Sequence, residues 1–207
     1  MNMLRVGLTG SIGVGKSYVS GVLQELGCHV VDADHTAREV VIPGAPGLEA
    51  VVSAFGSEVL REDGTLDRAK LGGIVFPDQE KRELLNSILH PFIIARQDEL
   101  LDEWEKDDPS GIGVIDAALI IESGGYKRLD KLIVVHCRPE VQLERLMTRD
   151  GLSQAEARQR VTAQMPQAEK CKYADYLIDT SEGFDSTRER TTEVLKQLRE
   201  LTVQHAV

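Results

Sequence analysis

Short apolar runs alternate with longer amphipathic stretches along most of the chain, and this pattern predicts strands that alternate with helices. The runs at residues 4–9, 112–116 and 131–137 are strongly apolar and too short for helices, so we expect buried strands there. Two further strands are predicted at residues 28–34 and 174–179. Such alternation is typical of a parallel sheet with helices on both faces and right-handed crossovers.

Amphipathic helices are predicted between these strands. In residues 17–26 apolar side chains recur at helical spacing, and Gly27 can close the helix. Ser153 and Glu156 have the spacing of a capping box, which predicts that a helix begins there. The other predicted helices span residues 35–41, 139–149, 153–164 and 184 to the end.

Residues 48–104 have a different character from the rest of the chain. They are mostly helical in pattern, with a turn at residues 61–64 and expected interruptions at Pro77 and Pro91. Strand-like alternation is almost absent. We therefore predict an α/β core at about residues 1–45 and 110–207, a helical insertion at about 46–108, and a lid at about 145–173.

Length and charge narrow the possible functions. The 207 residues suffice for one domain with an inserted lobe, and the net charge of −10 argues against general affinity for nucleic acid or anionic membranes. The three cysteines lack disulfide or metal-site spacing, so we expect idle thiols in a reducing cytosol. No signal peptide or membrane-spanning run is visible. We expect a cytoplasmic protein.

The strongest chemical signal is a glycine-rich loop between the first predicted strand and helix. Residues 10–17, GSIGVGKS, fit the phosphate-binding P-loop pattern, and this context disfavours a chance glycine-rich turn. The backbone N–H groups would cradle ATP phosphates, Lys16 would reach the β- and γ-phosphates, and the Ser17 hydroxyl would bind Mg²⁺. The predicted ATP-binding residues are Gly10, Ser11, Ile12, Gly13, Val14, Gly15, Lys16, Ser17 and Tyr18.

Carboxylates follow two of the predicted strands. Asp32 and Asp34 end the second strand and Asp116 ends the third, at the sheet edge where open parallel sheets bind ligands. One acid there can hold Mg²⁺ or its waters, and another can accept a proton from an attacking hydroxyl. Asp32 or Asp34 could instead cap the next helix. For Asp34 we favour the functional interpretation because of its position.

Other charged residues are less specific. Arg145 and Arg149 share a helix face and suit phosphate oxygens, although a solvated face paired with Glu144 and Asp150 is the alternative. His90 by spacing alone is more often structural than catalytic. The chain lacks the guanine-specifying [NT]KxD motif, so a GTP-driven switch is disfavoured. A small-molecule kinase is the class that the residues favour.

Several fragments extend this interpretation over nearly the whole chain. In order they are Leu8-Thr-Gly-Ser-Ile-Gly-Val-Gly-Lys-Ser17, Asp32-Ala-Asp34 with Ala37-Arg38, Pro43-Gly-Ala-Pro46, Leu89-His-Pro91, Asp116 to Glu122, Gln142 with Arg145, Arg149 and Asp150, and Gln164 with Lys170 and Ala174-Asp175. Together they resemble the dephospho-CoA kinase family. The resemblance implies a P-loop, nucleoside-kinase-like α/β fold with a parallel five-stranded sheet, a helical substrate-binding insertion and a lid.

The resemblance also implies the reaction and its residues. The family transfers the γ-phosphoryl group of ATP to the 3′-hydroxyl of dephospho-coenzyme A. Asp34 would be the base, Lys16, Arg145 and Arg149 would act on the phosphoryl group, and Mg²⁺ would be held by Ser17 and, through water, by Asp116. The implied substrate contacts are Asp34, Arg38, His90, Asp116 and Gln164.

Three positions depart from the family's pattern. Tyr18 replaces a Thr, which we expect to change packing under the loop; Ala118 replaces a Pro after the strand-ending acid; and Thr180 replaces an Asn that we expect to help seat the adenine. We expect a monomer with at most weak self-association. The alternatives are another P-loop small-molecule or nucleoside monophosphate kinase, and a regulatory nucleotide-binding module without catalysis.

Overall fold

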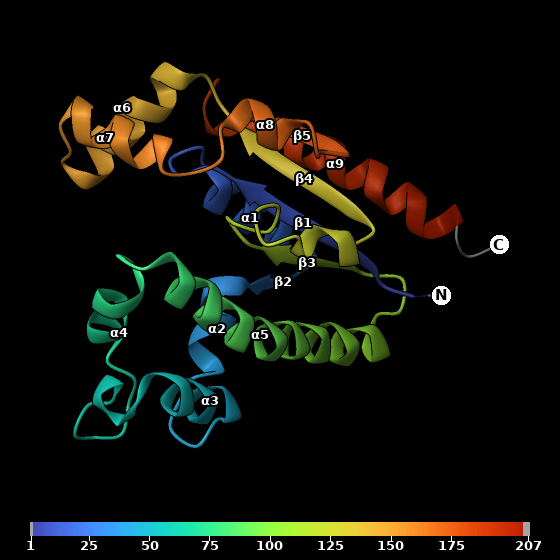
Figure 1. Ribbon diagram of the computed structural model, residues 1–207. Coiled ribbons are helices and arrows are strands. Elements are labelled where there is room, and N and C mark those ends of the chain that lie inside the picture. The colour runs from blue at the N-terminus through green and yellow to red at the C-terminus, as the bar shows by residue number, and fades with distance from the viewer. Residues whose placement is uncertain (1, 205–207) are drawn as a thin grey trace. The chain divides into compact units, whose positions relative to one another are not determined.

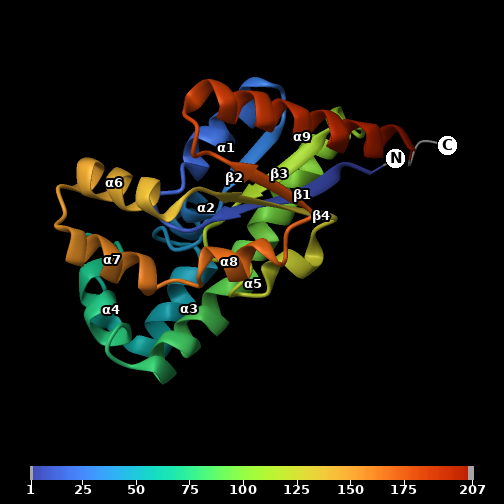
Figure 2. The ribbon, with the colours of Figure 1, turned by 90° about the horizontal axis from the view of Figure 1, so that it is seen from above.

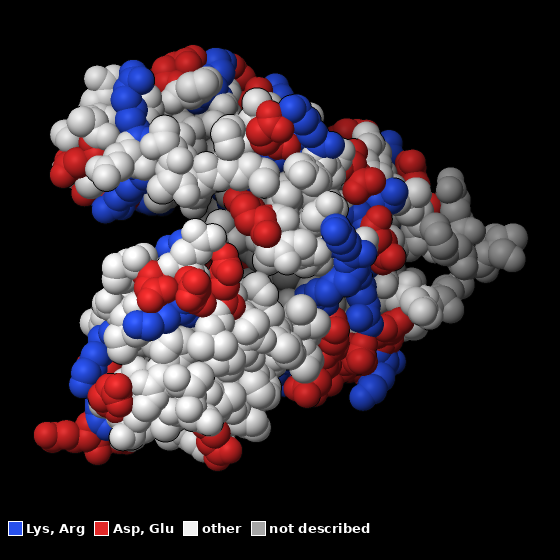
Figure 3. Space-filling view, in the orientation of Figure 1, with Lys and Arg blue, Asp and Glu red and all other residues white. Residues whose placement is uncertain are grey.

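The computed structural model describes residues 2–204, with side chains through residue 202. The chain divides into two compact units. The sheet unit consists of the residues up to 30 and from 103 onward, and the helical unit consists of residues 31–102. On the face that Figure 3 shows, Lys and Arg side chains lie close to Asp and Glu side chains on both units.

A five-stranded parallel sheet forms the centre of the sheet unit, as the sequence predicted. Its order is β2 (His29–Asp32), β3 (Ile112–Asp116), β1 (Leu4–Gly10), β4 (Lys131–His136) and β5 (Tyr176–Asp179). Figure 1 shows β1 between β3 and β4. Nearly every residue of β1, β3 and β4 is buried, which explains their continuous apolar runs, since helices cover both faces of such a sheet.

Helices of the sheet unit pack on opposite faces of the sheet. The first and last, α1 (Lys16–Glu25) and α9 (Phe184–Gln204), lie together on one face, and the short α8 (Gln167–Cys171) lies on the other (Figure 2). The remaining helices of this unit are η2 (Gly125–Arg128), α6 (Pro139–Asp150) and α7 (Gln154–Thr162). The predicted capping box of Ser153 and Glu156 begins α7.

The helical unit is built around its own apolar cluster. Its elements are α2 (Ala33–Glu39), α3 (Pro46–Phe55), η1 (Ser57–Val59), α4 (Arg68–Val75) and α5 (Gln79–Asp107), whose last turns belong to the sheet unit. Val51 and Val59 are fully buried at the centre of the cluster, and Leu71 and Val75 of α4 complete it. As the sequence predicted, the segment is almost entirely helical.

Two predicted boundaries were wrong. The second strand ends at Asp32, which is the N-cap of α2, so Asp34 lies in the first turn of a helix and not at a strand end. Asp32 Oδ1 accepts hydrogen bonds from the N–H groups of Asp34 (2.8 Å) and His35 (3.1 Å). Pro91 does not interrupt the chain's helical course: α5 continues through it. One proline removes a single backbone donor, and apolar residues of α5 pack on the cluster before it.

Two further observations bear on the sequence-based expectations. None of the helices within the described residues is long and apolar enough to cross a membrane. The three cysteines are free thiols, as expected, and Cys28 and Cys137 are buried. Burial raises the pKa of Cys28 to about 11, so this thiol stays protonated and unreactive at neutral pH.

Candidate active site

The glycine-rich loop joins the end of β1 to the start of α1 in a conformation that requires glycine. Gly13 and Gly15 have φ angles of 79° and 87°, where side chains are disfavoured. At Gly10 an added Cβ atom would lie 2.7 Å from the carbonyl oxygen of Val135, which is too close. The chain at these points therefore adopts the tight path that brings backbone N–H groups toward an anion.

The start of α1 offers unpaired donors at the same place. Its N-cap is Gly15, which has no side chain to cap the helix, and the first turn contains no acidic residue. The first N–H groups of a helix have no partner within the helix, and its dipole favours negative charge at this end. Loop and helix together make a site for phosphate groups.

Lys16 and Asp116 meet at this site. Lys16 Nζ forms an ion pair with Asp116 Oδ1, and their side chains are only 20% and 10% exposed. Asp116 is the last residue of β3 and lies opposite Leu8 of β1 in the sheet register. The fold thus brings together a residue of the glycine-rich loop and a strand-ending acid that are 100 positions apart in the sequence.

The segment after Asp116 is held by backbone contacts and does not need the proline found in the family's pattern. The N–H of Ala117 donates to the carbonyl oxygen of Leu8 (3.0 Å). The carbonyl oxygen of Ala118 accepts from Thr9 Oγ1 (3.0 Å) and Lys170 Nζ (2.7 Å). Lys170 is fully buried and also pairs with Glu122 Oε1 at 2.8 Å. Asp116 is therefore held by the pairing of β3 with β1 before it and by these hydrogen bonds after it.

Arg145 and Arg149 have different environments although they share a face of α6. Arg145 donates to Thr180 Oγ1 (2.8 Å) and to the Thr180 carbonyl oxygen (2.7 Å). A Cβ atom at Gly15 would lie 3.3 Å from Arg145 Nη1, so this guanidinium lies beside the phosphate loop. Arg149 is exposed and paired with Asp150 (2.7 Å), and that hydrogen bonding raises its pKa.

Thr180 contacts the phosphate loop. Its side chain is buried, and its hydroxyl donates to the carbonyl oxygen of Val14 (2.7 Å) while it accepts from Arg145. The predicted role of this position in seating adenine stays a prediction. In this structure Thr180 links β5, the loop and Arg145.

Two more predicted residues contact the same region. Gln164 Oε1 accepts from the N–H of Ile12 in the loop (2.8 Å), a contact that the sequence did not foresee; its predicted role toward substrate stays a prediction. Tyr18 packs its ring against that of Phe184, with centroids 4.7 Å apart, and its hydroxyl donates to the Phe184 carbonyl oxygen (3.3 Å). Tyr18 therefore packs on the start of α9, and its predicted effect on packing under the loop stays a prediction.

Comparisons with known proteins agree with this geometry. The family model described as dephospho-CoA kinase matches residues 4–186. A dephospho-CoA kinase of Carboxydothermus hydrogenoformans is 45% identical over 194 residues, which is 93% of either chain. Among solved structures, TT1252 from Thermus thermophilus matches with a TM-score of 0.79 at 29% identity, covering 95% of this chain and 98% of that one. A dephospho-CoA kinase from Campylobacter jejuni gives 0.71 at 30% identity, covering 95% and 97%.

The chain belongs to the dephospho-CoA kinase family. Members of this family are ATP-dependent phosphotransferases, and the P-loop of this chain suits that activity. The predicted fold class, with its five-stranded parallel sheet flanked by helices, is confirmed by both the sheet order and the structural matches.

The helical unit holds three of the predicted substrate contacts, and the other two, Asp116 and Gln164, lie in the sheet unit. Asp34 and Arg38 are exposed and lie four residues apart in α2, so they share one face of that helix, while His90 is half-buried in α5. Within residues 31–102, all of which the structure describes, no side chain pairs with the side chains of these three residues.

The donor set near the loop fits Mg²⁺ as a dephospho-CoA kinase would use it. Among residues 2–204, no cluster of three or more His, Cys, Asp or Glu could hold a metal by itself. Mg²⁺ in nucleotide sites needs no such cluster, because it binds one or two protein oxygens together with substrate phosphates and water. The Ser17 hydroxyl at the start of α1 and the Asp116 carboxylate are oxygens of this kind.

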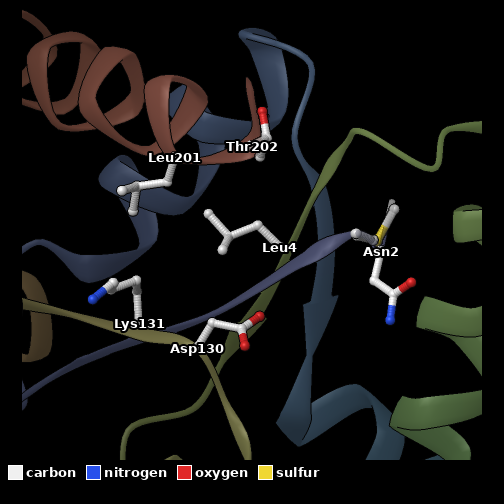
Figure 4. Close-up of a pocket in the computed structure, with 7 residues that line it drawn as sticks. Asn2, Leu4, Asp130, Lys131, Leu201 and Thr202 are labelled. Atoms are coloured by element: carbon white, nitrogen blue, oxygen red, sulfur yellow. The ribbon is translucent and has the colours of Figure 1, made fainter. Parts of the chain in front are cut away.

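A cavity of about 620 Å³ lies at the other end of the sheet (Figure 4). Leu4 and Lys131, the first residues of β1 and β4, line it together with Asp130, Leu201 and Thr202. Its charged groups already have structural partners: Asp130 Oδ2 accepts from the Arg5 N–H (2.8 Å), and Lys131 pairs with Asp175 (3.3 Å). Kinase chemistry belongs at the carboxyl ends of the strands, so we assign this cavity no catalytic role.

Proposed function

We propose that the protein transfers the γ-phosphoryl group of ATP to the 3′-hydroxyl of dephospho-coenzyme A, giving coenzyme A and ADP. The observation that carries this proposal is the glycine loop with Lys16 and Asp116 beneath it, in a chain 45% identical to a dephospho-CoA kinase over 93% of its length. Positioning and charge stabilisation account for most catalysis of phosphoryl transfer, and these residues are suited to both.

The residues of the sheet unit would bind ATP. We propose that Lys16 leaves Asp116 when the β- and γ-phosphates arrive, because a triphosphate offers a stronger negative charge to the same ammonium group. Asp116 is then free to hold a water of Mg²⁺, and Ser17 to bind the ion directly. Mg²⁺, when bound, neutralises phosphate charge and orients the γ-phosphoryl group.

Arg145 and Arg149 would have separate roles in the transfer. Arg145 lies beside Gly15, so a small movement of its guanidinium would reach a loop-bound phosphate. Arg149 would have to exchange Asp150 for the migrating phosphoryl group, an exchange that its exposure permits. Both would act most strongly in the transition state, where charge spreads over the transferred oxygens.

The residues of the helical unit would serve the acceptor. We propose that Asp34 accepts the proton of the 3′-hydroxyl as that oxygen attacks phosphorus, and that Arg38 and His90 contact dephospho-coenzyme A. An exposed carboxylate without a side-chain partner in its unit is suited to this work. We further expect a cytoplasmic monomer that closes residues of about 145–173 over the site and so excludes water.

An ADP-release assay with MgATP tests the proposal directly. Dephospho-coenzyme A, AMP, CMP and shikimate are compared as acceptors under identical conditions. We expect turnover with dephospho-coenzyme A alone, yielding product phosphorylated at the 3′ position. Turnover with a different acceptor would overturn the assigned substrate and leave the P-loop roles intact. ATP binding without turnover on any acceptor would identify a regulatory module instead.

A further inference from the structure

Ile12 of the phosphate loop has both of its backbone groups bound by side-chain amides. Its N–H donates to Gln164 Oε1 (2.8 Å), and its carbonyl oxygen accepts from Gln142 Nε2 (2.6 Å). The two glutamines come from different elements: Gln142 lies in α6, and Gln164 lies just after α7. The peptide groups on both sides of Ile12 are therefore held from outside the loop.

Gln142 is itself the middle of a longer chain of hydrogen bonds. The N–H of Cys137, directly after β4, donates to Gln167 Oε1 (3.1 Å). Gln167 Nε2 donates to Gln142 Oε1 (2.7 Å), and Gln142 Nε2 donates to the Ile12 carbonyl oxygen. We call these two glutamines, between Cys137 and Ile12, the glutamine relay.

The direction of the relay is fixed by its two ends. A backbone N–H at Cys137 can only donate, and a backbone carbonyl at Ile12 can only accept, so each intervening side chain must accept at one atom and donate at the next. A carboxamide does both at once. Gln142 is only 2% exposed, so water cannot replace a missing partner there.

The relay lies next to residues that the proposed mechanism uses. Gln142 is one helical turn before Arg145 on α6, and an added Cβ atom at Gly13 would lie 3.2 Å from the Gln142 carbonyl oxygen. Met165, directly after Gln164, also accepts from Ser11 Oγ (3.5 Å). Residues 11–13 of the loop are thus contacted by α6 and by the segment that joins α7 to α8. The contact of α8 is indirect, through the bond from Gln167 to Gln142.

We propose that Gln142 and Gln167 are positioning residues that set the conformation of the phosphate loop, and that Gln164 ties the predicted lid to the same loop residue. Their effect would reach ATP through Ile12, not through contact with the nucleotide. With Ile12 held, the backbone of the loop keeps its tight path before ATP arrives, so binding requires less reorganisation of that backbone. This inference rests on the proposed function only in taking the loop as the ATP site.

The test replaces Gln142 with methionine, which has similar length and removes both relay bonds. We expect the Kd for MgADP, measured by titration calorimetry, and the KM for ATP to rise by about tenfold, since a buried carbonyl loses its partner and the loop is released. The KM for dephospho-coenzyme A should stay within about twofold. Gln97→Met, at another buried glutamine, is the matched control and should leave the Kd for MgADP unchanged.

A double-mutant cycle tests the relay as one unit. Gln167→Met alone should weaken MgADP binding, and Gln142→Met with Gln167→Met should weaken it little beyond Gln142→Met alone, because either change breaks the same chain. If Gln142→Met does not fold, Gln167→Met still decides the matter, because Gln167 is less deeply buried. Strict additivity of the two changes would refute a relay.

Each result separates this inference from the proposed function. An unchanged Kd for MgADP in Gln142→Met or Gln167→Met, with only a lower melting temperature, would reduce the relay to a structural role. If the wild-type protein binds MgADP but prefers another acceptor, the proposed function fails while the comparison of variants stands. If the wild-type protein does not bind MgADP at all, both are overturned.

Discussion

Predicted site residues of the sheet unit and of the helical unit differ in the side-chain contacts that each makes within its own unit. Lys16 pairs with Asp116, and Arg145 is bonded to Thr180. Asp34 and Arg38 are exposed, and within residues 31–102 no side chain pairs with theirs. Lys16 and Arg145 are thus held by other side chains of the sheet unit, whereas no side chain of residues 31–102 holds Asp34 or Arg38.

The same contrast extends to how each unit is stabilised. In the sheet unit, buried Thr180 bonds the loop at Val14, and buried Lys170 bonds the segment after Asp116 at Ala118. The core of the helical unit is an apolar cluster formed by residues such as Val51 and Val59. Directional bonds favour one loop geometry, while apolar packing tolerates more variation. Mutations should therefore separate the two kinds of site.

The largest effect is expected at Lys16. Lys16→Ala removes the charge that would hold the β- and γ-phosphates, so we expect kcat/KM to fall by roughly 10³-fold or more, without unfolding. Lys131→Ala is the control. That lysine is the first residue of β4, at the end of the strand away from the glycine loop, and it forms an exposed ion pair with Asp175. Near-normal turnover by Lys16→Ala would show that the loop is not the ATP site.

Asp34 and its neighbour Asp32 provide a matched pair in the helical unit. Asp34→Asn should lower kcat by about 10²- to 10⁴-fold with little change in ATP affinity, because a general base acts in the transition state. Asp32→Ala should instead cost about 1 kcal/mol of stability through loss of the α2 N-cap, with a small effect on kcat. If ATP affinity collapsed in Asp34→Asn while kcat held, the residue would bind metal or maintain structure.

How far the sequence could predict this arrangement depends on the range of the interactions. The loop, β1 and Asp116 follow from local patterns, since a strand, a glycine run and a strand-ending acid are read from neighbouring residues. For Asp32 the sequence left two interpretations open, a functional carboxylate or a helix N-cap, and in the structure Asp32 is the N-cap of α2.

The remaining contacts could not be predicted because they join distant segments. Nothing in the residues around Lys170 indicates that it is buried against Ala118 and Glu122, 52 and 48 positions earlier in the chain. The short helix α8 that positions it has only five residues, too few for a periodic signal. Thr180 and Val14 are 166 positions apart and follow strands that do not pair with each other, so only the three-dimensional structure shows their contact.

Arg145 and Arg149 test the contrast within a single helix. Arg145→Met should raise the KM for ATP and lower kcat together, because it removes the bond to Thr180 beside Gly15 and, on the proposed mechanism, a group that binds phosphate. Arg149→Met should lower kcat by about tenfold to a hundredfold and leave MgADP binding nearly unchanged, since Arg149 pairs only with Asp150 before transfer. Equal losses of nucleotide affinity in both variants would remove the distinction.

The smallest effect on catalysis is expected at Lys170, whose role concerns the stability of the sheet unit. Lys170→Met leaves Glu122 without its buried partner and the Ala118 carbonyl with Thr9 Oγ1 alone. We expect a loss of about 3 kcal/mol, at the lower end for a broken buried pair because Glu122 reaches solvent. Two residues on, Lys172→Met removes an exposed pair with Glu169 and should cost less than about 1 kcal/mol. Denaturant unfolding measures both. Equal stability of the two variants would mean that the segment after Asp116 is held by its backbone bonds alone, and the phosphate site would then owe its order to the loop and the residues that bond it.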